Sequence, residues 1–170
     1  MVSNPGRNSV RNTMLIKFLA YTGARISEAM KLKVSSVYDG HKVLDSLVFQ
    51  KTKNKTNRRI PINTNYQSEL LNYIQSNDLL LDSPLFPSER GGHISAQAGS
   101  LLVKKLLKSA GIMDASCHSI RKFSLMTMLR NNVNLQTIRQ VSGHKSLASL
   151  QHYLASSQDE VKKAVDVITI

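Results

Sequence analysis

Residues 118–154 read HSIRKFSLMTMLRNNVNLQTIRQVSGHKSLASLQHYL, and the spacing of apolar side chains along this stretch predicts three consecutive helices. The first covers about 119–130, where Ile120 and Phe123 recur at helical spacing. Asn134 begins a second helix that ends at Gly143, and Ser146 can cap a third. The stretch therefore indicates a helical domain whose helices are separated by short turns.

The helical pattern continues toward the N-terminus. Residues 8–21 carry apolar side chains at helical spacing, Thr22-Gly23 interrupts them, and a short helix is expected from about Ile26 to Lys33. Further helices are predicted after Asn63 or Thr64 and after Ser95, the second of them closed by Gly111, with a loop over 82–95 between them.

One region has a different pattern. Val43–Gln50 and Arg58–Ile62 are strand-like and flank the polar tip KTKNKT, so a β-hairpin is expected there. The predicted fold class is mostly α with a small antiparallel β-sheet. We expect one domain over 1–156, followed by a C-terminal helical tail over 157–170, where Ser157 and Glu160 have capping-box spacing.

The charge balance is strongly basic, with 23 Lys and Arg against 11 Asp and Glu, a formal charge of +12 and a pI near 10. Such a surplus favours a polyanionic partner, because each phosphate that is neutralised releases counterions. A soluble basic protein or a membrane-surface binder would share this charge. No apolar stretch approaches the roughly 18 to 20 residues of a membrane span, and a lone Cys117 favours a reducing setting, so we expect a cytoplasmic or nucleoid-associated protein.

Several common motifs are absent from the sequence. It has no Walker-type loop, no GxGxxG, no HExxH, no paired-Cys zinc spacing and no acidic cluster suited to two magnesium ions, so we expect neither a metal nor a cofactor. Phosphoryl chemistry on DNA would then need fixed cations around the phosphate, a nucleophile, and a proton for the departing oxygen. Arginine suits the first task, lysine or histidine the last, and tyrosine can attack.

Four local patterns supply such residues. TGARISE (22–28) delivers Arg25 to a helix start, and KTKNKTNRRIP (51–61) holds five basic residues in nine positions at the hairpin. HSIR (118–121) places His118 and Arg121 within one helical turn, and SGH (142–144) is followed nine residues later by Tyr153. Each pattern alone is more often structural than catalytic, and only their joint appearance points to a site.

Taken together and in this order, the patterns resemble the catalytic domain of tyrosine recombinases, the phage integrase and Xer family, over about residues 8–155. TGARISE resembles the family's first arginine box, HSIRK its His-x-x-Arg box, and SGHKSLASLQHYL its Gly-His box with the nucleophilic tyrosine. The resemblance implies the tyrosine recombinase catalytic-domain fold. It also implies site-specific DNA strand exchange through a covalent phosphotyrosine intermediate, without metal or ATP.

The resemblance assigns a role to each matching residue. Arg25 and Arg121 would clamp the scissile phosphate, with His144 as a further phosphate contact. His118 would be a general base or a phosphate donor. Tyr153 would form a 3′-phosphotyrosine bond and leave a free 5′-OH.

A hairpin lysine would protonate that 5′ oxygen. Lys51 has a family-like Lys-Thr context, whereas Lys53 lies at a family-like distance from Pro61, and the atypical length of the hairpin tip leaves both open with Lys51 favoured. The remaining basic candidates for contact with DNA phosphates, or else for a merely solvated surface, are Lys55, Arg58, Arg59, Lys104, Lys105, Lys108 and Lys122.

Two rival functions carry similar features. A type IB topoisomerase would use the same chemistry on one strand at a time, and a non-catalytic basic DNA-binding module would share the charge but has no reason to carry the full residue set. The expected partners are double-stranded DNA and other recombinase protomers in a DNA-bound assembly, with a monomer when free and the tail packed on its own domain or on a neighbour. Because full-length relatives usually carry an N-terminal DNA-binding domain, the chain is expected to be a fragment or a short member.

Overall fold

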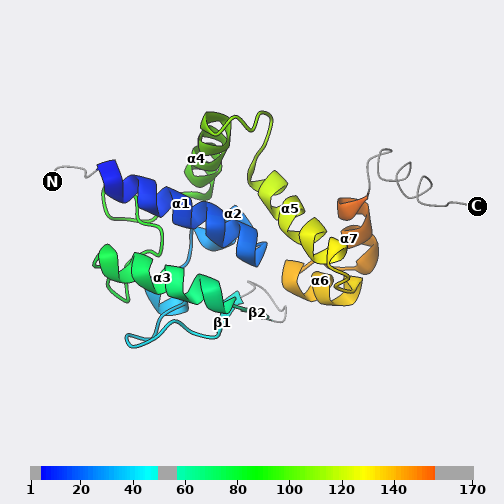
Figure 1. The fold of residues 1–170 in the computed structure, drawn as a ribbon, viewed down its shortest axis with the longest axis horizontal. Coiled ribbons are helices and arrows are strands. Elements are labelled where there is room, and N and C mark those ends of the chain that lie inside the picture. The colour runs from blue at the N-terminus through cyan, green and yellow to red at the C-terminus, as the bar shows by residue number, and fades with distance from the viewer. Residues whose placement is uncertain (1–4, 50–56, 156–170) are drawn as a thin grey trace, which may run out of the picture.

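The computed structural model describes residues 5–49 and 57–155 and is mostly helical, with a two-stranded antiparallel sheet (Figure 1). This confirms the predicted fold class. The elements are α1 (Pro5–Thr22), α2 (Ile26–Ala29), a 3₁₀ turn (Val34–Ser36), β1 (Ser46–Phe49), β2 (Arg58–Pro61), α3 (Thr64–Ser76), α4 (Ala96–Ser109), α5 (Cys117–Arg130), α6 (Leu135–Ser142) and α7 (Leu147–Leu154).

The two strands form the predicted hairpin over a shorter range than expected. They pair with Ser46 opposite Pro61 and Phe49 opposite Arg58. Strand alternation turns Arg58 and Ile60 toward the interior and leaves Arg59 exposed. The hairpin tip, with Lys51, Lys53 and Lys55, lies outside the described residues.

Helix α1 forms much of the main core, because Leu15, Phe18 and Leu19 are fully buried on one of its sides. The Phe18 ring meets Phe86 edge to face, with ring centroids 5.4 Å apart, which adds a favourable aromatic contact to the burial. This core anchors α1 against α3 and α5, and so fixes the residues at the start of α2 relative to α5.

A second, smaller core joins the last three helices through buried side chains of α5, α6 and α7, namely Leu125, Ile138, Leu150 and Leu154. In Figure 1, α6 and α7 lie against the C-terminal part of α5, away from α3 and α4. This packing places α6 against both α5 and β2, and α7 against α5 and α6.

Four helix starts and the end of α6 follow the predicted capping chemistry. The side chains of Asn63, Ser95, Asn134 and Ser146 each accept a hydrogen bond from the backbone at the start of a helix. Gly143 ends α6 in the left-handed conformation with φ +67°. These contacts are local, which is why the sequence alone predicted them.

Three helix boundaries differ from the prediction, the first being that α1 begins at Pro5 and not near residue 8. Helix α2 ends at Ala29, not near Lys33, because Leu32 and Val34 instead bond the backbone of residues 83–85. Helix α5 begins at Cys117, two residues before the predicted start, because Ser116 caps it. Phe123 is 63% exposed, so it lies on the outer side of α5 and not in the predicted apolar face.

A membrane-spanning helix and a metal-binding cluster are both absent from the described residues. Over residues 5–49 and 57–155, no helix is long and apolar enough to cross a membrane. Within the same ranges, no group of three or more histidine, cysteine, aspartate or glutamate side chains could hold a metal ion. The expected tail over 157–170 lies outside the described residues.

Candidate active site

A pocket of about 310 Å³ opens between the start of α2, the first turns of α5, the α6–α7 turn and the end of α7. Five residues predicted as catalytic from the sequence meet there. Its lining consists of Ala24, Arg25, Ile26, Ser27, Cys117, His118, Arg121, His144 and Tyr153.

Arg121 is the buried cation of the pocket, with 4% of its surface exposed. Its guanidinium donates to two backbone carbonyls, Nη1 to that of Gly23 and Nη2 to that of Ser142 at 2.7 Å. Burial, together with the nearby cations Arg25 and Arg58, lowers the pKa of Arg121 to about 10. Arg121 therefore stays charged at neutral pH and has neutral partners, which leaves its charge available to an anion in the pocket.

Arg25 precedes α2, and its side chain is 43% exposed at the pocket. Its Nη1 lies 3.2 Å from Oε1 of Glu28, while Oε2 of Glu28 accepts from the Arg25 backbone N–H and from Nη2 of Arg58, each at 2.8 Å. Burial by itself raises the pKa of Glu28, but these donors and cations outweigh it and hold the pKa below its ordinary value. Glu28 thus stays ionised and fixes both arginines.

His144 stands on the turn that follows α6, directly after Gly143. Its Nδ1 lies 2.7 Å from Oγ of Ser142, and its ring packs near that of Tyr153, with centroids 5.2 Å apart. Burial and the cations Arg121, Arg25 and Arg58 lower the pKa of His144 to about 4. At neutral pH the imidazole is therefore uncharged, and one of its ring nitrogens carries a proton.

Tyr153 reaches the pocket from the last turn of α7. Its hydroxyl donates to the backbone carbonyl of His118 at 3.1 Å. Burial raises the pKa of Tyr153, and the neighbouring Arg121 and Arg25 offset part of that rise. The hydroxyl therefore keeps its proton at neutral pH, and an attack by its oxygen needs a base. His118 on α5 has an exposed side chain and lines the same pocket, which makes it a candidate for that base.

The residues predicted to contact DNA differ in their exposure to solvent. Arg58 is buried, with 6% exposed, which corrects the expectation that it contacts DNA from the surface. Its neighbour Arg59 is exposed and donates to Oγ of Ser46 at 3.2 Å. Exposed lysines lie outside the pocket, three on α4 and one on α5: Lys104, Lys105, Lys108 and Lys122.

Burial of Arg58 beside the pocket was not predicted from the sequence, although the pattern of neighbouring residues indicates burial. Arg58, Ile60 and Ile62 alternate along the predicted strand over 58–62, which places all three on the same face, and the two isoleucines indicate that this face is buried. Arg58 was grouped with the exposed DNA-contact candidates because it adjoins the basic tip of the hairpin. Its carbonyl partner at Ser142 could not be predicted, since it is brought near only by tertiary packing.

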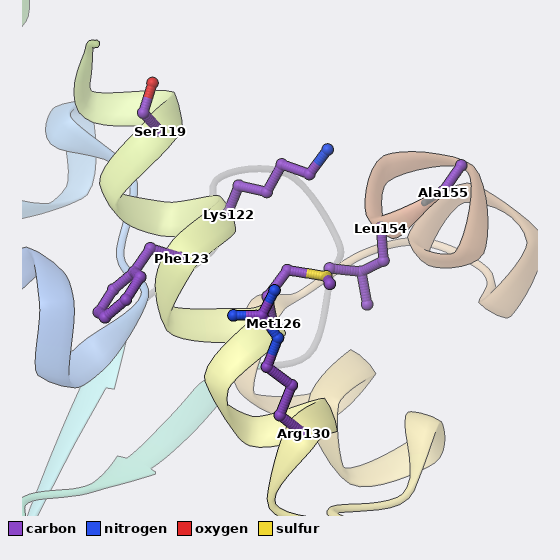
Figure 2. A pocket seen from close by; sticks show the side chains of 7 residues that line it. All are labelled: Ser119, Lys122, Phe123, Met126, Arg130, Leu154 and Ala155. Carbon is purple, nitrogen blue, oxygen red and sulfur yellow. The ribbon is translucent and has the colours of Figure 1, made fainter. Parts of the chain in front are cut away.

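A second pocket of about 320 Å³ lies on the outer side of α5 (Figure 2). Lys122 and Met126 extend from α5 toward the end of α7, and Met126 packs against the small core that includes Leu154. No predicted catalytic residue belongs to its lining, which is Ser119, Lys122, Phe123, Met126, Arg130, Leu154 and Ala155.

The chain is similar in sequence to known tyrosine recombinases. Residues 1–160 match the phage integrase family. The chain is 25% identical over 162 residues to tyrosine recombinase XerH of Campylobacter jejuni, covering 94% of this chain and 45% of the relative. It is 28% identical over 159 residues to tyrosine recombinase XerD of Corynebacterium glutamicum, covering 91% and 51%. The chain thus spans about half the length of the curated relatives it matches.

The fold is also that of solved recombinases. The crystal structure of XerA recombinase matches with a TM-score of 0.77 and 21% identity, over 100% of this chain and 66% of that one. The post-cleavage complex of XerH site-specific recombinase with its palindromic difH substrate matches with a TM-score of 0.75 and 19% identity, over 98% and 48%. These likenesses confirm the expected tyrosine recombinase catalytic-domain fold.

Proposed function

The chain belongs to the phage integrase family, and on that basis we propose that it cleaves and rejoins DNA at specific sites through a 3′-phosphotyrosine intermediate. One observation carries the proposal: two arginines, two histidines and a tyrosine from three separate parts of the chain line a single pocket. Fixed cations beside a nucleophile are what transfer of a phosphodiester requires.

In the proposed reaction, the scissile phosphate lies between Arg25 and Arg121, whose charges offset the negative charge that develops on its oxygens. The oxygen of Tyr153 attacks phosphorus and the bond to the 5′ oxygen breaks. His118 takes the proton of the tyrosine hydroxyl, and a neutral His144 donates a hydrogen bond to the phosphate without adding charge. One phosphate ester replaces another, so rejoining needs no ATP.

The 5′ oxygen leaves with a proton from a hairpin lysine. Lys51 is favoured over Lys53 on its sequence context, and both lie outside the described residues. Support for a general acid in the hairpin comes from β2. Its inward-facing Arg58 bonds Glu28 and the carbonyl of Ser142 at the end of α6, and so holds the base of the hairpin beside the pocket. The basic residues that remain exposed at the surface would contact flanking phosphates.

Double-stranded DNA and further recombinase protomers are the proposed partners. The net charge of +12 supports the first, and the DNA-bound XerH complex is a relative of the same fold. Association with the nucleoid would follow from DNA binding. The two rivals are not favoured: the matched relatives are named recombinases, and a binding module would not need the residue set of this pocket.

The tail over 157–170 is proposed to pack on its own domain or on a neighbouring protomer. Support comes from the second pocket, whose lining includes Ala155, the last described residue, together with the apolar side chains of Met126 and Leu154. An apolar stripe such as Val161 and Val165 is stabilised by burial against such a surface.

The proposed function is tested with nicked suicide substrates that trap the covalent intermediate. Because the target site is unknown, the substrates carry a randomised central sequence, and adducts that survive SDS are recovered and sequenced. The wild-type chain should yield adducts and Tyr153→Phe none, while the non-covalent DNA affinity of the two stays nearly equal. A Phe variant that still forms adducts would show that another residue is the nucleophile.

A further inference from the structure

We infer that Arg58 is a positioning residue for the proposed cleavage reaction: it fixes the acceptors that hold Arg25 and Arg121, and the turn that carries His144. This inference rests on the proposed function. Arg58 does not line the pocket, and its buried side chain makes it unsuited to touch DNA.

The contacts of Arg58 join three separate elements. From β2, Nη2 donates to Oε2 of Glu28 on α2 at 2.8 Å, and Nη1 donates to the carbonyl of Ser142 at the end of α6 at 2.7 Å. The guanidinium carbon lies 4.5 Å from the centroid of the Phe49 ring on β1. A planar guanidinium held on three sides sets the direction of each hydrogen bond that it donates.

Arg58 shares one acceptor with each arginine of the pocket. The Ser142 carbonyl that it bonds also accepts from Nη2 of Arg121 at 2.7 Å. The carboxylate of Glu28 that it bonds also holds Nη1 of Arg25 at 3.2 Å. A displacement of Arg58 would therefore shift the partners of both phosphate-binding cations at once.

The turn before His144 is packed directly on this side chain. Gly143 has φ +67°, and a Cβ atom there would lie 2.8 Å from Nη1 of Arg58 and 3.2 Å from its Cδ. Ser142, on the other side of Gly143, bonds Nδ1 of His144 through its hydroxyl at 2.7 Å. Arg58 thus supports the backbone from which His144 enters the pocket.

Stability alone does not account for an arginine at this position. Burial lowers the pKa of Arg58, which Glu28 offsets only in part, and Nε of Arg58 is buried without a hydrogen-bond partner. An apolar side chain on this inward face of β2 would avoid both costs. The arginine adds a fixed geometry between Glu28 and Ser142, which an apolar residue cannot supply.

The test compares Arg58→Lys with a matched control, Arg11→Lys. Arg11 is also buried and also donates to a backbone carbonyl, that of Pro87 at 2.7 Å, but it lies on α1 and does not line the pocket. Lysine keeps the charge at position 58 but lacks the fork that spans two acceptors. Single-turnover cleavage at saturating DNA, non-covalent affinity and the thermal midpoint are measured for both variants and the wild type.

Arg58→Lys should slow cleavage by about 10-fold to 10²-fold, because a small misplacement of reacting groups can have an effect of this size. The DNA affinity should stay unchanged. Arg11→Lys should lower the thermal midpoint and cleave at the wild-type rate. The inference is overturned if Arg58→Lys cleaves as fast as wild type. It is also overturned if Arg11→Lys slows cleavage as much at an equal loss of thermal stability.

A second measurement does not depend on activity, so failure of the proposed function can be told apart from failure of this inference. The imidazole of His144 is titrated by NMR in the free chain, with His144→Gln used for assignment. The groups that face it are Arg121, Arg25, Arg58 and Tyr153. Arg58→Gln, which keeps a donor and loses the charge, should raise the pKa of His144, and Arg58→Lys should leave it low. No change in Arg58→Gln would show that Arg58 does not act on His144.

Discussion

The hydroxyl of Tyr153 donates a hydrogen bond to the backbone carbonyl of His118 across 3.1 Å, and so joins the last turn of α7 to the first turn of α5 within one chain. The tyrosine therefore stands in the same pocket as Arg25 and Arg121 of its own protomer. An attack on a phosphate held by these arginines would take place within that protomer.

This geometry predicts that cleavage uses the tyrosine and the arginines of one protomer. Tyr153→Phe lacks the nucleophile, and Arg25→Ala lacks a cation whose side chain is 43% exposed, so the second variant should still fold. A mixture of the two on a suicide substrate should form no more adduct than the variants give separately. Restored cleavage in the mixture would mean that the tyrosine is donated to a neighbour.

Removal of either pocket arginine should slow cleavage by roughly 10²-fold or more, the scale of one deleted oxyanion donor. Arg121→Ala should also destabilise the chain by about 1–3 kcal/mol, because it removes the donor to the buried carbonyl of Gly23 and leaves that of Ser142 with Arg58 as its donor. Lys108 lies on the exposed side of α4. Lys108→Ala should instead weaken DNA binding and reduce the slope of the logarithm of the binding constant against the logarithm of salt concentration by about one unit. Equal kinetic effects from all three variants would contradict this distinction between site and surface.

A sulfur substitution in the DNA identifies the residue that protonates the leaving oxygen. Lys51→Ala should slow cleavage of a normal phosphodiester but have little effect when the bridging 5′ oxygen is sulfur, which leaves without a proton. Lys53→Ala is the matched comparison two residues away. If the bridging sulfur restores cleavage by Lys53→Ala but not by Lys51→Ala, Lys53 is the general acid. If it restores cleavage by neither variant, the general acid lies outside the hairpin.

Gly143→Ala should be more damaging than Gly111→Ala, although both glycines have a positive φ. The two share the strain of about 1–2 kcal/mol for an alanine in the left-handed region. A Cβ at position 143 would also lie 2.8 Å from Nη1 of Arg58, whereas nothing lies within 4 Å at position 111. Denaturant unfolding should give a larger loss for Gly143→Ala, and only that variant should cleave more slowly. Equal losses in both assays would argue against the packing of Arg58 on this turn.

The stability of the free chain should fall as the pH drops from about 6.5 to about 4 through the titration of His144. The folded pKa of His144, lowered to about 4 by burial and by Arg121, Arg25 and Arg58, lies below that of the unfolded chain. The unfolded state then binds more protons in this window, and acid favours it. His144→Gln should show a smaller loss of unfolding free energy between pH 6.5 and pH 4 than wild type. An identical pH profile would exclude His144 as a source of the effect.

The sequence by itself determined the helices, their caps and the residues that could do chemistry. Apolar periodicity, a capping side chain such as Asn134 and a left-handed glycine such as Gly143 act over a few neighbouring residues, so their pattern is visible without a fold. The order of the four motifs likewise identified the family, and this was confirmed by the match over 1–160.

Only the tertiary structure decided how those residues meet. Arg58 and Arg59 are adjacent and chemically identical, yet the first is buried against Glu28 and the carbonyl of Ser142 while the second is exposed. The carbonyl of Ser142 has no side-chain signature, and it becomes the shared acceptor of Arg58 and Arg121 because α6 packs on α5 and β2. Such contacts join residues far apart in the chain, and their geometry follows from the packing of whole helices and not from any local pattern.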